Sequence, residues 1–386
     1  MIGKKVILLV CSLFIAVVIA EIAVRAISPQ TTYSYSVRNS IDCYAPDANV
    51  AFSLAKSHRC KMENMAGEFH TTATLNSLGY RGKEFTHEKK SETTRILTLG
   101  DSMTFGWGVG DEHTWPNLLE KNLTQKGKNV EVINAGYKGG LSLDGYYVYL
   151  KNEGIKLAPD LVIVGYMVFN DISDLAGNNW EKVDSEGLPE KVSSCCHVVD
   201  GKVLRNRQIS FKFRYPILRE SHLFQLIFNT LQKKYEFFKD SELLTTPGEK
   251  QLGCELSPDC IHLFYPQEQK AYQLLAAMQK ITESKGGKFL VVLLPIDLQF
   301  YPQSWDKYQR YGMKWYPKKG EEDFINQRVK GELSKRGINV LDLYPVFSQR
   351  KDEAYPFFPL DAHFNEMGTA WVADAISNFL HEGKML

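Results

Sequence analysis

TLGDSMTFGWG, residues 98–108, joins an apolar run to a turn that is rich in glycine. The run RILTLG at 95–100 is short and ends in glycine, which is typical of a buried β-strand. A strand followed at once by Gly-Asp-Ser places Ser102 at the carboxyl end of that strand. A serine in such a turn commonly caps a helix, but it can also serve as a nucleophile. The rest of the chain has to decide between these two interpretations.

Four further apolar runs alternate with amphipathic segments. We expect strands at 130–136, 159–166, 288–295 and 338–345. We expect helices at 114–127, 267–287, 324–337 and 365–380. Strands that are apolar throughout and alternate with helices are typical of a parallel sheet covered on both faces. The sequence therefore predicts an α/β fold, a three-layer α/β/α sandwich with a five-stranded parallel sheet, over residues 91–386.

The N-terminal segment, residues 1–27, has the pattern of a signal anchor. Lys4 and Lys5 precede an uncharged apolar run from Val6 to Ala20. The lysines should keep the N-terminus cytoplasmic. The rest of the chain would then be membrane-anchored and face the periplasm or the outside of the cell. Cleavage of a signal peptide, followed by secretion, is the alternative.

Two further segments lack the alternating pattern. Residues 28–90 have no strong hydrophobic period and are expected to form a linker and an N-terminal extension. Residues 176–265 form an insertion that interrupts the α/β alternation. Within it, the stretch at 220–238 has the apolar spacing of an amphipathic helix. This helix would pack on the domain core, lie on the membrane or cover a substrate cleft.

Composition narrows the classes of function. The 386 residues carry a formal net charge of +1, and no basic stripe indicates a nucleic-acid partner. Outside the apolar run, the cysteines are Cys43, Cys60, Cys195, Cys196, Cys254 and Cys260. An even set in an exported domain predicts disulfides, and Cys43 with Cys60 and Cys254 with Cys260 are nearest in sequence. The spacings do not match structural zinc sites, so no metal is expected.

Polar residues follow the predicted strands at one edge of the sheet. Gly100-Asp101-Ser102 follows the first strand, NAGYKGG (134–140) the second and MVFNDISD (167–174) the third, while LDAHFN (360–365) precedes the last helix. In open parallel sheets, ligands bind beyond the carboxyl ends of the strands. The sequence therefore predicts a site built from these four loops.

Ester cleavage by serine needs a nucleophile, a base, a group that orients the base and donors for the oxyanion. Ser102 can supply the hydroxyl, His363 the base and Asp361 the orienting carboxylate. The oxyanion donors would be the backbone N–H groups of Ser102 and Gly139 and the side-chain amide of Asn170. We expect Asp101 to fix the turn through local hydrogen bonds.

These four loops resemble the conserved blocks of the SGNH hydrolase superfamily, the GDSL esterases and lipases. GDSMTFG, NAGYKGG, VFND and DAHFNEMG occur in the family's order. The resemblance implies a flavodoxin-like SGNH fold, with Ser102, Gly139, Asn170, Asp361 and His363 in the roles given above. NSLGYRGKEF (76–85) and the N-terminal anchor further resemble a bacterial membrane-anchored branch. The single residue between Asp361 and His363 departs from the usual two, which leaves Asp342 as an alternative acid.

The resemblance implies a serine esterase that hydrolyses acetyl or longer acyl esters through an acyl-serine intermediate. An exported domain suggests an acylated small molecule, glycan or lipid as the substrate. An O-acyltransferase that modifies a polysaccharide through the same site is one alternative, and a non-catalytic envelope assembly protein is another. No cofactor is expected, because GWGVG lacks the dinucleotide-binding spacing and no Walker A lysine is present.

Overall fold

The structure is a computed structural model of the whole chain, and it divides into two compact units. The smaller unit comprises Met1–Ser40 and Arg205–Lys250, and the larger comprises Ile41–Leu204 and Gln251–Leu386. The structure describes residues 2–30, 32, 41–64, 67–193, 196–199, 201–205, 215–234, 253–310, 313, 317–383 and 385.

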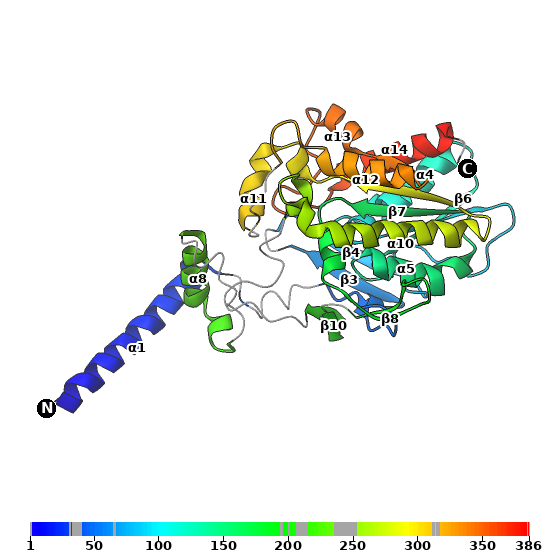
Figure 1. Cartoon of the computed structure of the whole chain (residues 1–386). Helices are drawn as coiled ribbons and strands as arrows, with labels where there is room; N and C mark the ends of the chain where they lie inside the picture. Colours follow the sequence, from blue (N-terminus) through cyan, green and yellow to red (C-terminus); the bar gives the residue numbers. More distant parts are fainter. Residues whose placement is uncertain are drawn as a thin grey trace. The chain divides into compact units, whose positions relative to one another are not determined.

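A five-stranded parallel sheet forms the centre of the larger unit (Figure 1). Its strands are β5 (Thr94–Gly100), β6 (Val130–Gly136), β7 (Leu161–Met167), β12 (Lys288–Leu294) and β13 (Asn339–Asp342). They lie in the order β13-β12-β7-β5-β6, and every neighbouring pair is parallel. This is the doubly wound order in which the first two strands exchange places, as in flavodoxin. The predicted fold class is confirmed.

Helices cover both faces of the sheet (Figure 1). They are α3 (Ser102–Phe105), α4 (Trp115–Gln125), α5 (Leu143–Asn152), α6 (Asp171–Ala176), α10 (Tyr265–Glu283), α11 (Trp305–Arg310), α12 (Phe324–Lys335), α13 (Tyr344–Arg350) and α14 (Glu366–Glu382). Helices α4 and α14 pack together on one face, while α5 and α10 pack together on the other. All four long helices predicted from the sequence are present, with ends that differ by a few residues.

The N-terminal extension contains short strands that the sequence analysis did not anticipate. They are β1 (Tyr44–Ala45), β2 (Ser53–Leu54), β3 (His58–Glu63) and β4 (His70–Leu75). Strands β3 and β4 form an antiparallel hairpin, in which Cys60 and Met62 are buried and the alternating polar residues Arg59, Lys61 and Glu63 are exposed. A second hydrophobic cluster joins the extension to Phe105 and Tyr137, which belong to the loops after β5 and β6.

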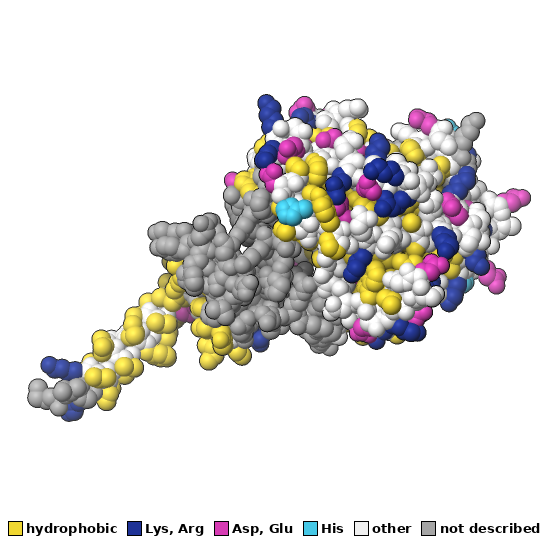
Figure 2. Space-filling view, viewed as in Figure 1, with side chains coloured by type: hydrophobic (Ala, Val, Ile, Leu, Met, Phe, Trp, Pro, Cys, Tyr) yellow, Lys and Arg dark blue, Asp and Glu magenta, His cyan; other side chains and the backbone are white. Residues whose placement is uncertain are grey.

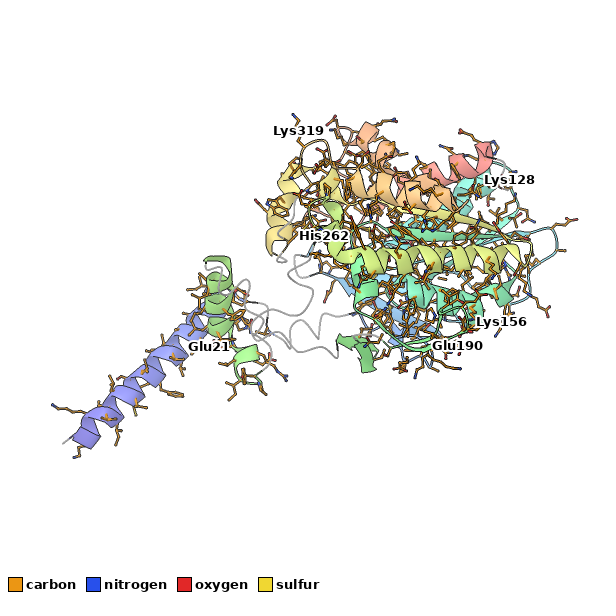
Figure 3. The ribbon with its side chains drawn as sticks, viewed as in Figure 1. Glu21, Lys128, Lys156, Glu190, His262 and Lys319 are labelled. Carbon is orange, nitrogen blue, oxygen red and sulfur yellow. A yellow bond between two sulfur atoms is a disulfide. The ribbon has the colours of Figure 1, made fainter. Side chains whose placement is uncertain are left out.

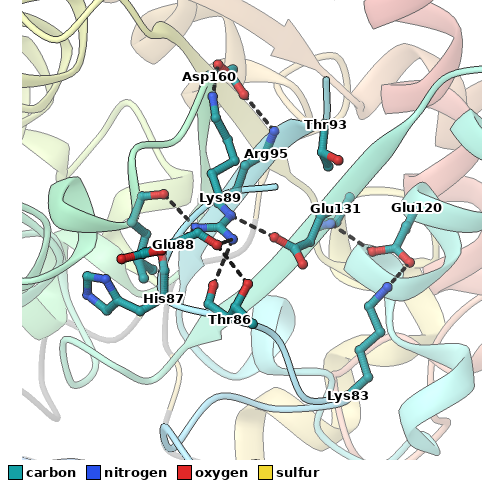
Figure 4. A network of polar contacts seen from close by, with 12 residues as sticks. Lys83, Thr86, His87, Glu88, Lys89, Thr93, Arg95, Glu120, Glu131 and Asp160 are labelled. Carbon is teal, nitrogen blue, oxygen red and sulfur yellow. Dashed lines mark hydrogen bonds and ion pairs between the residues drawn. The ribbon is translucent and has the colours of Figure 1, made fainter. Parts of the chain in front are cut away.

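The end of the extension is fixed to the opposite, N-terminal edge of the sheet. The buried Arg95 of β5 donates to the carbonyls of Thr86 and His87 and pairs with Glu131 at 2.7 Å (Figure 4). Lys89 pairs with Asp160 at 2.6 Å. These bonds hold residues 86–89 against the sheet, so the extension is attached at both edges.

The insertion between α6 and α10 adds two small hairpins, and two disulfides lie in the larger unit. Strands β8 (Asn179–Val183) and β9 (Pro189–Ser193) pair, as do β10 (Cys196–Val199) and β11 (Lys202–Arg205). Cys43 is bonded to Cys60 and Cys254 to Cys260, which confirms the two nearest-neighbour pairings. The side chains of Cys195 and Cys196 lie outside the described residues.

The smaller unit contains α1 (Ile2–Ile27) and α8 (His222–Lys234), which pack against each other. Residues Lys4–Ile27 of α1 are long and apolar enough to cross a membrane, with a mean hydropathy of 2.9. A signal sequence would pass the same criterion. Figure 2 shows hydrophobic side chains along α1, whereas charges of both signs are mixed on the visible face of the larger unit.

Candidate active site

The turn after β5 presents Ser102 as the first residue of α3. Asp101 caps this short helix, and its Oδ1 accepts the Met103 N–H at 2.9 Å. A Cβ at Gly100 would collide with the Thr104 hydroxyl. Gly106 ends α3 with a φ of +89°, a conformation that favours glycine. The glycines therefore allow a tight turn that leaves the Ser102 side chain at the sheet edge.

Three side chains from two distant loops form a hydrogen-bonded chain. His363 Nε2 lies 2.7 Å from Ser102 Oγ. On the other side of the imidazole ring, His363 Nδ1 bonds to Asp361 Oδ1. Burial alone would raise the pKa of Asp361, but His363 and the Trp107 N–H lower it to about 2. The carboxylate is thus ionised at any ordinary pH and can orient the ring.

Trp107 makes a further hydrogen bond to the series Ser102–His363–Asp361, and no sequence motif predicted it. Its indole Nε1 donates to Asp361 Oδ2 at 3.1 Å, so each oxygen of that carboxylate accepts a side-chain bond. The indole also packs edge-on against Phe69 of the extension, with ring centroids 5.7 Å apart. The only sequence signal is that Trp107 lies in the same glycine-rich turn as Ser102.

Asn170 lies at the carboxyl end of β7 and reaches the turn after β5. Its amide Nδ2 lies 3.3 Å from Asp101 Oδ2 and 2.8 Å from Asp174 Oδ2. Both acceptors are carboxylates, which fixes the amide nitrogen toward the Ser102 turn. Both N–H groups of the Asn170 amide already have a carboxylate acceptor in the structure. A substrate oxyanion would therefore have to share or replace one of these two acceptors.

Buried carboxyls surround this amide. Burial raises the pKa of Asp101, while the Met103 N–H and the neighbouring His363 oppose the rise. Burial, and then the charge of Asp101, raises the pKa of Asp171 well above its ordinary value. The rise has a physical cause, because two buried carboxylates at close range disfavour double ionisation.

The loop after β6 holds both Gly139 and Tyr137. A Cβ at Gly139 would lie 2.5 Å from the Gly145 carbonyl of α5, so the close approach requires glycine. Among the described residues, no hydrogen bond joins Gly139 to Ser102, Asn170 or His363. Tyr137 has a φ of +65°, an uncommon conformation for a residue with a Cβ, and its buried hydroxyl interacts with Ser102. No sequence pattern distinguishes Tyr137 from other tyrosines.

The extension contacts both loops through buried cations. Arg81 donates to the carbonyls of Phe105, Gly106 and Val109, each at 2.6 Å, and it pairs with Asp111 at 2.9 Å. From the other loop, Lys138 donates to the Leu78 carbonyl at 3.4 Å. Its ammonium lies over the Tyr80 ring, 4.7 Å from the centroid. The segment 76–81 therefore braces the loops that carry Ser102 and Gly139.

The loop that carries Asp361 and His363 is held by its own polar contacts. The Phe358 N–H donates to the His363 carbonyl at 2.9 Å. Asn365 caps α14 and donates to the carbonyls of Tyr355 and Phe357. The buried Lys307 donates to the Phe358 carbonyl at 3.3 Å and pairs with Asp297 at 2.6 Å. These bonds fix the loop beside the end of β12.

Asp342, the alternative acid, is engaged elsewhere. Its Oδ1 accepts from Asn326 Nδ2 at 2.8 Å and from the Tyr344 N–H at 3.0 Å. The structure thus brings Asp361, and not Asp342, to His363. No group of three or more His, Cys, Asp or Glu side chains suited to a metal ion occurs among the described residues.

Sequence comparisons agree with this arrangement. Residues 264–386 match the family described as SGNH hydrolase-like domain, acetyltransferase AlgX. The match contains Asp361 and His363 in the loop that meets Ser102. The match supports the resemblance of the chain to the SGNH hydrolase superfamily. An arylesterase of Vibrio mimicus is 34% identical to the chain over 70 residues, which is 18% of this chain and 34% of the arylesterase.

Solved structures of lipases and esterases also align with the chain at low identity. A GDSL-like lipase from Bacteroides thetaiotaomicron is 12% identical, with a TM-score of 0.38 over 78% of this chain and 93% of that chain. A lipase/acylhydrolase from Enterococcus faecalis is 12% identical, with a TM-score of 0.40 over 75% and 96%. An acetyl xylan esterase is 13% identical, with a TM-score of 0.38 over 74% and 98%.

Proposed function

We propose that the chain is a serine esterase that hydrolyses acyl ester bonds through an acyl-serine intermediate. The observation that carries the proposal is the 2.7 Å separation between Ser102 Oγ and His363 Nε2, with Asp361 on the other ring nitrogen. A nucleophile, a base and an orienting carboxylate in this order are the parts that acyl transfer by serine requires.

In the first half of the reaction, His363 Nε2 takes the Ser102 hydroxyl proton as Oγ attacks the ester carbonyl carbon. The negative charge on the carbonyl oxygen is stabilised by the Ser102 and Gly139 N–H groups and the Asn170 amide. The Ser102 N–H is at the first helical position of α3, where the helix itself supplies no acceptor. His363 then gives the proton to the leaving alcohol, and the acyl group stays on Oγ.

In the second half, water enters where the alcohol left. His363 takes a proton from the water, whose oxygen attacks the acyl carbon, and the carboxylic acid leaves as the proton returns to Ser102. Asp361 stays ionised throughout and stabilises the imidazolium that forms in each half.

Hydrolysis of p-nitrophenyl acetate by the wild type and by Ser102→Ala tests the proposal. We expect Ser102→Ala to lower kcat by about 10⁶, as removal of a triad serine does elsewhere. Ser284→Ala is the control, because Ser284 is exposed at the end of α10 and its hydroxyl donates to the Ile281 carbonyl. Equal activity of Ser102→Ala and the wild type would overturn the proposal.

An O-acyltransferase is a second candidate, because the matched family is described as an acetyltransferase. The same acyl-serine would then be resolved by a sugar hydroxyl in place of water. Product analysis with and without an added polysaccharide separates the two activities. An acylated polysaccharide supports the transferase, whereas free acid alone in both reactions supports the esterase.

We further propose that α1 anchors the catalytic domain at the membrane, with that domain in the periplasm or outside the cell. The apolar helix Lys4–Ile27 and the two disulfides support this location. An acylated envelope glycan or lipid would then be the accessible substrate. Alkaline carbonate extraction of cell membranes tests the anchor: the chain should stay in the membrane pellet, and its release would favour a cleaved signal peptide.

A further inference from the structure

A carboxylate of α1 caps the amphipathic helix α8. Figure 3 labels Glu21 on α1. Its Oε2 accepts the Leu223 N–H and the Ser221 hydroxyl, each at 2.8 Å, and its Oε1 accepts the His222 N–H at 3.0 Å. The Gln30 N–H donates to His222 Nδ1 at 2.8 Å. Free N–H groups at a helix start favour an anion. The start of α8 is therefore fixed beside Glu21 of α1.

Glu21 lies near the C-terminal end of the apolar part of α1. The uncharged run from Val6 to Ala20 has a length of about 22 Å at 1.5 Å per residue. A hydrocarbon core of about 30 Å requires Ile22, Ala23 and Val24 as well. Glu21 then lies within the apolar layer, close to its boundary, where an unpartnered carboxylate is costly. The amides of α8 and the Arg25 guanidinium, 3.2 Å away, offset this cost.

Apolar side chains are exposed on α8 and on the residues just before it. Ile227 is 49% exposed and Ile217 is 86% exposed. By contrast, Phe228 and Gln225 are buried. Isoleucines exposed on and just before a short helix are unfavourable in water, but they are favourable at the boundary between lipid headgroups and acyl chains.

We propose that α8 lies in the surface of the membrane that α1 enters, as a second membrane contact of the chain. The inference rests on the proposed membrane anchoring of α1. Lipid is the occupant that the observations favour, because Glu21 fixes the start of α8 at the edge of the apolar layer. Apolar side chains are exposed on α1 as far as Ile22 and Ile27, and again at Ile217 and Ile227. A surface helix beside the anchor would restrict how the chain can rotate and tilt at the bilayer.

Photocrosslinking of the full chain tests this placement. The photoreactive amino acid p-benzoylphenylalanine replaces Leu8, Ile227 or Val183 in separate variants, which are reconstituted in vesicles of phosphatidylethanolamine and phosphatidylglycerol. Position 8 lies on α1 and reports the anchor. Val183, on β8 of the larger unit, is the matched control because it is 49% exposed, like Ile227. Mass spectrometry then identifies lipid and peptide adducts.

We expect lipid adducts at positions 8 and 227 and not at 183. Lipid adducts at position 8 alone would overturn the placement of α8 and leave the anchor intact. Adducts between position 227 and peptides of the larger unit would also overturn it, because α8 would then cover that unit. An absence of lipid adducts at position 8 would overturn the anchor as well.

Replacement of the capping carboxylate tests the connection between the two helices. Glu21→Gln removes the charge that the α8 amides bind, so the lipid adduct at position 227 should fall several-fold while that at position 8 stays unchanged. Glu220→Gln is the control, because Glu220 lies beside α8 but faces Arg219. Equal lipid adducts at position 227 in Glu21→Gln and the wild type would refute the role given to Glu21.

Discussion

Trp107 Nε1 donates a hydrogen bond of 3.1 Å to Asp361 Oδ2, which links the turn of Ser102 to the loop of His363. Asp361 thus accepts one side-chain bond on each oxygen, from the indole and from the imidazole. A carboxylate held from both sides cannot rotate freely, so Trp107 acts as a positioning residue for His363.

Trp107→Phe keeps the aromatic packing against Phe69 and removes the N–H donor. We expect kcat/KM to fall about tenfold or more, since a hydrogen bond to a charged group contributes about 1.5–3 kcal/mol. Without the indole donor, the Asp361 carboxylate would interact more strongly with the His363 imidazolium. The acidic limb of the pH profile of kcat/KM should therefore move to higher pH.

The control for this variant is Trp180→Phe. Trp180 Nε1 donates to Asp144 Oδ2 at 2.9 Å, so the variant loses the same kind of bond away from Ser102. Its pH profile should match that of the wild type. An unchanged acidic limb in Trp107→Phe would refute the positioning role, even if overall activity fell.

Asn170→Ala tests the amide at the end of β7. We expect kcat to fall by about 10²–10³, as loss of one oxyanion donor does in serine hydrolases, with a smaller change in KM. Asn178→Ala is the matched control, because Asn178 also donates its amide to a carboxylate, that of Asp144 at 2.9 Å. Similar kcat values for the two variants would exclude Asn170 as a donor to the oxyanion.

Arg81→Lys tests the brace between the extension and the turn of Ser102. A lysine ammonium cannot reproduce the planar set of bonds from Arg81 to three carbonyls and Asp111. We expect a loss of about 1–3 kcal/mol in the free energy of unfolding, measured by urea denaturation, because buried carbonyls lose their hydrogen-bond donor. kcat should fall as well. Arg336→Lys, which alters the surface pair with Glu332, should change stability by less than about 0.5 kcal/mol.

Glu255 makes the stability of the larger unit depend on pH. Burial raises its pKa to about 8, and the nearby Asp174 adds to the rise. The folded state therefore keeps a proton that the unfolded state releases near its ordinary pKa of 4.5. The free energy of unfolding should fall by about 5 kcal/mol between these two pKa values as the pH rises, at about 1.4 kcal/mol per unit.

Glu255→Gln removes this titration. Urea unfolding at about pH 5 should give similar stabilities for the variant and the wild type, whereas at about pH 9 the variant should be more stable. The exposed Glu283→Gln should leave the pH dependence as it is. A parallel pH dependence of Glu255→Gln and the wild type would show that Glu255 does not titrate in this range.

The strands and the loops that follow them could be predicted because they depend on local patterns. RILTLG and VEVINAG are apolar runs of strand length, and each ends in glycine. Parallel strands bring their carboxyl ends to one edge, so Ser102 and Asn170 had to lie near each other. The pairing of His363 with Asp361 follows from their adjacency in the same loop.

Other features depend on tertiary contacts, which the hydrophobic periodicity of the sequence does not predict. The bond from Trp107 to Asp361 joins residues 254 positions apart. Arg81 looks like a surface charge in sequence, yet its side chain is 1% exposed because four acceptors surround it. The hairpin of β3 and β4 alternates inward and outward residues, but it is short and mostly polar.

Fluorophosphonate labelling of the full chain in detergent, with the adduct mapped by mass spectrometry, tests the central claim most directly. We expect a single stable adduct on Ser102 that is absent from Ser102→Ala and much slower to form in His363→Ala, because the base activates the hydroxyl. A folded protein that forms no adduct, or forms it on another serine, would contradict the assignment of Ser102 as an activated nucleophile.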